Sequence, residues 1–92
     1  MDIELLEKKG TIALLLAIGD DPGRTPRSMA TFVNSKGEKS VDQTVLRRIG
    51  DLVRAGLADS VPDVYRGREV TRISLSATGR RVYALLVALR EM

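Results

Sequence analysis

Residues 40–57 (SVDQTVLRRIGDLVRAGL) constrain the fold most, because their periodicity predicts one helix with two dissimilar faces. Ser40 and Gln43 fit a capping box at its start, and Gly56 fits the position just after its end. The apolar stripe contains Val41, Val45, Ile49 and Leu52. The opposite, polar and cationic stripe contains Gln43, Arg47, Gly50 and Arg54. One face is therefore suited to a core, and the other to close contact with another macromolecule.

Composition narrows the classes of protein. Ninety-two residues predict a single domain, 1–92, and a hydrophobic fraction of 43% is normal for a folded one. The chain has no Cys and no His, which excludes disulfides, thiolate or imidazole metal sites and a Cys nucleophile. With no phosphate loop and no converging carboxylates, we expect neither an enzyme nor a cofactor. The longest apolar run, 11–18, is too short to span a bilayer, so we expect no membrane partner and a cytoplasmic location.

Charge is unevenly distributed along the chain. Residues 24–81 contain twelve Lys and Arg against six Asp and Glu, whereas residues 1–23 contain two Lys against five acids. This polarity favours a polyanionic partner for the basic part. A solvated, mildly basic surface explains the charge equally well.

The remaining elements follow from caps and breakers. Residues 2–18 predict a helix capped by Asp2, or a short arm, 2–9, joined at Gly10 to a buried helix, 11–18. A second helix begins at Thr25-Pro26 and carries its apolar face as far as Val33. Residues 57–61 and 69–75 predict two strands of a hairpin, and Ser76 caps a last helix that ends near residue 91. The predicted order is α–α–α–β–β–α.

Two passages resemble the winged helix-turn-helix transcription regulators of prokaryotes, the broad MarR, PadR and ArsR-like group. Residues 44–57 resemble that group's recognition helix, which ends in L-x-x-x-G-L, and residues 73–80 resemble its second wing strand and following L-T-x-x-G-R. The resemblance implies an α+β, mostly helical winged helix. The helix at 40–55 would enter the major groove of double-stranded DNA, and the wing at 62–68 would meet backbone or minor groove. The connection at 34–39 is longer than the group's usual tight turn.

Candidate DNA contacts follow from the outward stripe and the nearby cations. Gln43 and Arg47 are expected to read base edges, although Gln43 has pure capping as an alternative. Asp42 either accepts from a cytosine amino group or supports the helix N-terminus, and Leu46 either meets a thymine methyl group or packs against the second helix. Thr44 flanks these residues. Phosphate contacts are expected from Arg24, Arg27, Lys36, Lys39, Arg66 and Arg68.

The last helix, 76–92, is apolar around most of its circumference, which predicts a homodimer formed through it. The expected dimer residues are Val82, Leu85, Leu86, Leu89 and Met92. A monomer with this helix lying in a groove is the alternative. The leading hypothesis is sequence-specific DNA binding by a small transcriptional regulator; an architectural DNA-coating protein and a winged helix used only for protein contacts remain open.

Overall fold

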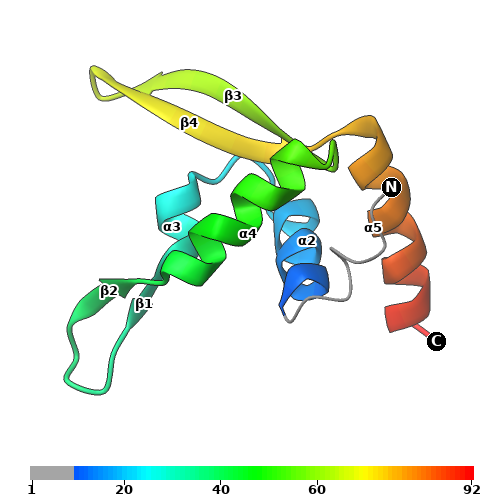
Figure 1. The fold of residues 1–92 in the computed structure, drawn as a ribbon, viewed down its shortest axis with the longest axis horizontal. Helices are drawn as coiled ribbons and strands as arrows, with labels where there is room; N and C mark the ends of the chain where they lie inside the picture. Colours follow the sequence, from blue (N-terminus) through cyan, green and yellow to red (C-terminus); the bar gives the residue numbers. More distant parts are fainter. Residues whose placement is uncertain (1–9) are drawn as a thin grey trace.

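A computed structural model describes residues 10–92 and arranges them as helices with two projecting β-hairpins (Figure 1). In chain order the elements are α2 (Thr11–Asp20), α3 (Pro26–Ala30), β1 (Thr31–Val33), β2 (Lys39–Val41), α4 (Gln43–Arg54), β3 (Ala58–Tyr65), β4 (Arg68–Leu75) and α5 (Ala77–Arg90). The predicted α+β, mostly helical class is confirmed. Gly10, with φ 82°, precedes α2 where a break was expected. The predicted cap Asp2 and arm 2–9 lie outside the described residues.

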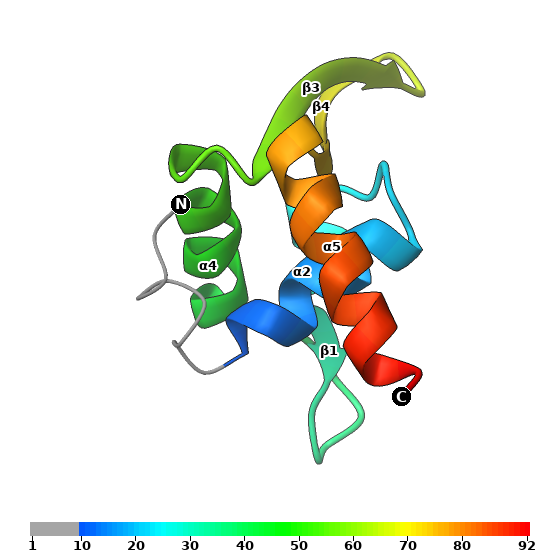
Figure 2. The same ribbon diagram turned by 90° about the vertical axis from the view of Figure 1, so that its right-hand side faces the viewer.

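Helix α2 is central, with α4 on one side and α5 on the other (Figure 2). Leu15 and Ile18 of α2 are fully buried, and they meet Ile49 and Leu52 from the apolar stripe of α4. The whole core cluster consists of Leu15, Ile18, Ile49, Leu52, Leu57, Ala58, Ile73, Leu75 and Val82. Aliphatic burial of this kind holds the helices against the base of the β3–β4 hairpin.

The second predicted helix is too long. Helix α3 begins as expected, with Thr25 accepting from the Ser28 backbone N–H at 3.2 Å, but it ends at Ala30. The chain then turns into β1, which pairs with β2 so that Phe32 lies opposite Ser40. β-Branched residues on either side of Phe32 favour a strand, and the Asn34 N–H closes the hairpin on Glu38 O at 2.9 Å. The predicted order therefore lacks this hairpin.

The N-cap of α4 also differs from the prediction. Ser40 lies in β2, and Asp42 caps the helix by accepting from the N–H groups of Thr44 at 2.9 Å and Val45 at 3.4 Å. The β1–β2 ladder delays the helix, because the Asp42 N–H still donates to Ala30 O at 2.8 Å. The capping box of Ser40 and Gln43 is therefore wrong.

The end of α4 and the start of α5 follow the prediction. Gly56, with φ 76°, lets the Leu57 N–H return to Leu52 O at 2.9 Å, which is a Schellman-type ending. Ser76 caps α5 by accepting from the Gly79 N–H at 3.0 Å. Strand β3 continues past the predicted limit through Pro62, whose missing N–H is tolerated on an edge strand.

The β3–β4 hairpin is joined at its base to the loop between α2 and α3. Ile73 N donates to Arg24 O at 2.8 Å, and Gly23 N donates to Ile73 O at 2.9 Å. This short bridge adds a third segment beside β4. The loop is consequently held in position against the wing.

Candidate nucleic-acid interface

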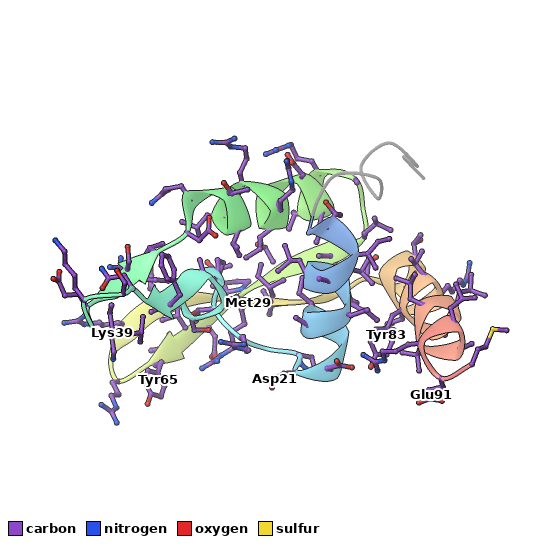
Figure 3. The ribbon with its side chains drawn as sticks, turned by 90° about the horizontal axis from the view of Figure 1, so that it is seen from below. Asp21, Met29, Lys39, Tyr65, Tyr83 and Glu91 are labelled. Atoms are coloured by element: carbon purple, nitrogen blue, oxygen red, sulfur yellow. The ribbon has the colours of Figure 1, made fainter. Side chains whose placement is uncertain are left out.

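Helix α4 presents the two faces that its sequence predicts. Val45 packs on the core while Ile49 and Leu52 are buried, whereas Gln43 and Arg47 are exposed. Side chains extend outward from this helix along one edge of the molecule (Figure 3). We call the exposed Gln43, Thr44, Arg47 and Arg54 the polar edge of α4.

Asp42 has a structural role at the start of that edge. Its carboxylate accepts two backbone N–H groups of the first turn, so the helix-supporting alternative is the one that the structure displays. Gln43 is the first residue of α4, and Thr44 the second; both are exposed. Leu46 is half-buried.

Arg47 is distinguished from its neighbouring arginines by its lack of an ion-pair partner among the described residues. Arg48 is half-buried and pairs with Asp51 at 3.2 Å, and Arg54 also donates to Asp51. Gly50 lies between them, where an added β-carbon would have the flexible Arg54 guanidinium 3.4 Å away. Arg47 therefore retains its hydrogen-bonding capacity for an external acceptor.

The β1–β2 hairpin projects beyond the start of α4 (Figure 1). Two hydrogen bonds close its tip, where the Asn34 side chain accepts from the N–H groups of Lys36 and Glu38, both at 3.0 Å. Lys36 and Lys39 are exposed on it. Lys39 and Arg27 also line one shallow groove of about 390 Å³ between α3 and this hairpin. Three of the predicted phosphate contacts are thereby brought to one region.

The wing tip is a two-residue turn with strained geometry. Arg66 has φ 51° and Gly67 has φ 75°, which is the pattern of a type I′ hairpin. Left-handed backbone costs a residue with a side chain about 1–2 kcal/mol. The Arg66 guanidinium carbon lies 5.2 Å from the centre of the Tyr65 ring, a cation–π contact at the surface.

The structure gathers four arginines beside the wing, three of which the sequence predicted as phosphate contacts. Arg66 and Arg68 line a groove of about 990 Å³ together with Arg24 and Arg72. Arg24 was among the expected phosphate contacts, whereas Arg72 was missed. The sequence did contain a signal for Arg72, because every second residue of a strand points to the same face and Arg72 follows Arg68 and Val70 at this spacing.

Two of these arginines are held in place by the protein. Arg72 donates to Asp63 at 2.6 Å and to Gly23 O at 2.9 Å, and Arg24 donates to Ser28 O at 2.8 Å. The hydrogen bond from Arg72 is the main cause that holds the pKa of Asp63 below its ordinary value, and the Val64 N–H adds to it.

Helix α5 divides the expected dimer residues into two groups. Val82 is 8% exposed and belongs to the core of its own chain, and Leu86 packs partly against that core. Val82 therefore has to be removed from the predicted dimer surface. Leu85, Leu89 and Met92 are 69%, 64% and 96% exposed.

A polar network fixes α5 on α2. Tyr83 Oη donates to Asp20 Oδ1 at 2.5 Å, and Arg90 Nη1 donates to Asp20 Oδ2 at 3.2 Å. The Tyr83 bond, followed by that of Arg90, lowers the pKa of Asp20, and the same carboxylate raises the pKa of Tyr83. The exposed leucines of α5 are thus carried on a helix with a defined position.

A metal centre and a membrane span are two further features that residues 10–92 do not contain. No group of three or more His, Cys, Asp or Glu side chains in this part of the chain is arranged to hold a metal ion. None of its helices combines the length and apolar character required to cross a bilayer.

The described elements define a winged helix-turn-helix domain: α3 and α4 form the helix pair, β3 and β4 the wing, and α5 the flanking helix. Three solved structures share this fold. The crystal structure of the transcriptional regulator SlyA superposes with a TM-score of 0.72 at 25% identity, over 96% of this chain and 58% of that one. A MarR protein from Peptoclostridium difficile gives 0.70 at 23% identity, over 96% and 54%. A crystal structure of MarR gives 0.67 at 22% identity, over 96% and 60%.

These similarities show a MarR-like winged-helix domain, as the sequence resemblance implied. The chain spans 54–60% of the length of these solved structures. No family model matches the chain, and no curated protein sequence matches it.

Proposed function

We propose that this protein binds double-stranded DNA sequence-specifically as a dimeric transcriptional regulator. The observation that carries the proposal is the polar edge of α4, where Gln43 and Arg47 are exposed one helical turn apart and Arg47 has no ion-pair partner among residues 10–92. A helix of about 10 Å diameter fits a major groove of about 12 Å. Gln reads adenine and Arg reads guanine, both with two hydrogen bonds. Thr44 and Leu46 adjoin these two side chains.

Positive charge on both hairpins supports the same proposal. Lys36 and Lys39 belong to β1–β2 and its tip, and Arg66 and Arg68 to the wing. Backbone contacts of this kind position a domain on the duplex without selecting a sequence. Asp42 is assigned to support of the α4 N-terminus, and Arg27 to a phosphate beside Lys39.

The proposed regulatory role is supported by the solved structures of similar fold, because one of them, SlyA, is described as a transcriptional regulator. A homodimer through Leu85, Leu89 and Met92 of α5, with Leu86 at its margin, would place two copies of α4 about 34 Å apart on the duplex. A target on the chromosome of a prokaryote implies a cytoplasmic location.

Selection of bound sites from a random duplex pool tests the proposal. The selected duplex should bind at least ~10³-fold more tightly than random DNA of equal length. Equal affinity for both would instead support an architectural coating protein. If the protein binds neither duplex at low ionic strength, the result would support a winged helix that is used only for protein contacts.

A further inference from the structure

The groove between the wing and the α2–α3 loop is a second cationic surface, separate from the polar edge of α4. Within the described part of the chain, it is lined by four arginines and one acidic residue, namely Arg24, Arg66, Arg68, Arg72 and Asp21. Figure 3 shows the labelled Tyr65 and Asp21 toward the side of the molecule opposite α4. The groove therefore does not simply continue the polar edge of α4.

The arginines of this wing groove come from segments that the fold has joined. The bridge between Arg24 and Ile73 sets the loop against β4, and it uses backbone atoms only. On β4, Arg68 and Arg72 point to the same face because they are four residues apart, a separation of about 13 Å along the strand. Arg24 lies at the inner end and Arg66 at the outer end of this row.

The guanidinium groups are partly preorganised. Hydrogen bonds to Asp63, Gly23 O and Ser28 O hold Arg72 and Arg24 in the groove. A guanidinium has five N–H donors in a planar fork, so both retain donors for an anion. Among residues 10–92, the ion pairs of these four arginines are those of Arg72 with Asp63 and of Arg24 with Asp21, the latter at 3.9 Å. The groove keeps a net positive charge.

We propose that the wing groove is a phosphate-binding site that takes a multivalent phosphate anion. Forked guanidinium groups match phosphate oxygens bidentately, and Ser28 and Thr25 add hydroxyl groups at the rim. The phosphates come either from a DNA backbone that bends toward this face or from a free phosphorylated small molecule. The first source deepens the proposed function and rests on it, whereas the second does not.

Inorganic tripolyphosphate is the probe, titrated into the full chain by calorimetry at low ionic strength. We expect one saturable site, weakened about tenfold or more in the double variant Arg24→Ala/Arg68→Ala, because this variant lacks two guanidinium groups that can donate charge-assisted hydrogen bonds to the anion. These changes leave the backbone bridge in place, and the circular dichroism spectrum and Tm of the variant check its fold. Arg80→Ala/Arg81→Ala is the matched control, because it removes the same charge from the exposed start of α5.

Competition identifies the source of the phosphates. If the selected duplex displaces tripolyphosphate one for one, the site belongs to the DNA interface; if both bind together, it serves a free phosphorylated molecule. A wild-type chain that does not bind tripolyphosphate, or an equal loss in both double variants, would overturn the proposal. Failure to bind any duplex, with tripolyphosphate binding intact, would remove the proposed function but not this site.

Discussion

Gly79 lies so close to Leu57 that a β-carbon at position 79 would be 1.9 Å from the Leu57 carbonyl oxygen. The same oxygen accepts from the Ser76 N–H at 3.1 Å. The first turn of α5 is therefore packed directly on the junction between α4 and β3. The glycine of the L-S-A-T-G-R passage has a steric reason, which the sequence pattern alone did not reveal.

Gly79→Ala should lower the free energy of unfolding by about 1–3 kcal/mol or more, because main-chain atoms have to move. Urea denaturation measures the change. Gly50→Ala is the control: a β-carbon there meets only the Arg54 guanidinium, so the variant should gain up to ~1 kcal/mol from helix propensity. Equal effects of the two substitutions would contradict the steric account.

Arg66→Asn should stabilise the free protein while weakening DNA binding. Asparagine tolerates the left-handed φ of 51°. Relief of about 1–2 kcal/mol of backbone strain outweighs loss of an exposed cation–π contact worth about 0.5–1 kcal/mol. Thermal unfolding and the salt dependence of duplex binding are the two measurements. Arg68→Ala should weaken binding without the gain in stability; a destabilised Arg66→Asn variant would show that the turn is not strained.

Asp20→Asn should make stability less dependent on acid pH. The pKa of Asp20 is lowered in the folded chain, first by the Tyr83 hydrogen bond and then by Arg90. A lowered folded pKa contributes stability above the unfolded value, near 4, that disappears as the pH falls through the folded value. Urea midpoints should be measured from pH 2 to pH 7 at intervals of about one pH unit. As the pH is lowered, the midpoint should fall less steeply in the variant than in the wild type.

The raised pKa of Tyr83 has the opposite sign. Its contribution is present below the unfolded pKa, near 10, and is lost as the pH rises through the folded value. Tyr83→Phe removes the hydrogen bond that lowers the pKa of Asp20 and raises the pKa of Tyr83. In this variant, folding stability should therefore depend less on pH in both the acid and the alkaline range. An unaltered acid limb in both Asp20→Asn and Tyr83→Phe would mean that the network contributes nothing in solution.

Arg47→Ala should change which base is preferred, with a loss of about 1–3 kcal/mol of discrimination at one position. Lys36→Ala/Lys39→Ala should instead weaken all duplexes alike and reduce the slope of log K against log salt by up to ~1.8, at about 0.9 per phosphate contact. Binding to a panel of single-base variants at several salt concentrations separates the two effects. A changed base preference in the lysine variant would assign the β1–β2 hairpin to base recognition.

Leu85→Glu/Leu89→Glu should convert a dimer into a monomer with little loss of folding stability, because both side chains are more than 60% exposed. Light scattering reports the mass, and duplex affinity should fall with it. Thr78→Glu, at an exposed position near the start of α5, is the control. A wild-type monomer at micromolar concentration, about 10 μM, would remove the dimer from the proposal.

Sequence alone determined the elements whose information is local. The two faces of α4, the Gly56 ending, the Ser76 cap and the wing could be predicted because periodicity and caps act within a few residues. The β1–β2 hairpin was missed because residues 31–33 continue an apolar pattern that suits a helix equally well. Only pairing with residues 39–41, which also moved the cap from Ser40 to Asp42, decided between them.

Tertiary structure alone decided which residues meet across long stretches of chain. Val82 was predicted on a dimer surface, yet packing against α2 and the wing base buries it. Arg72 joins Arg24 only because a backbone bridge sets the α2–α3 loop beside β4. A helical wheel or a strand pattern tells which side chains share a face, but the partner of that face is chosen by the packing of the whole core.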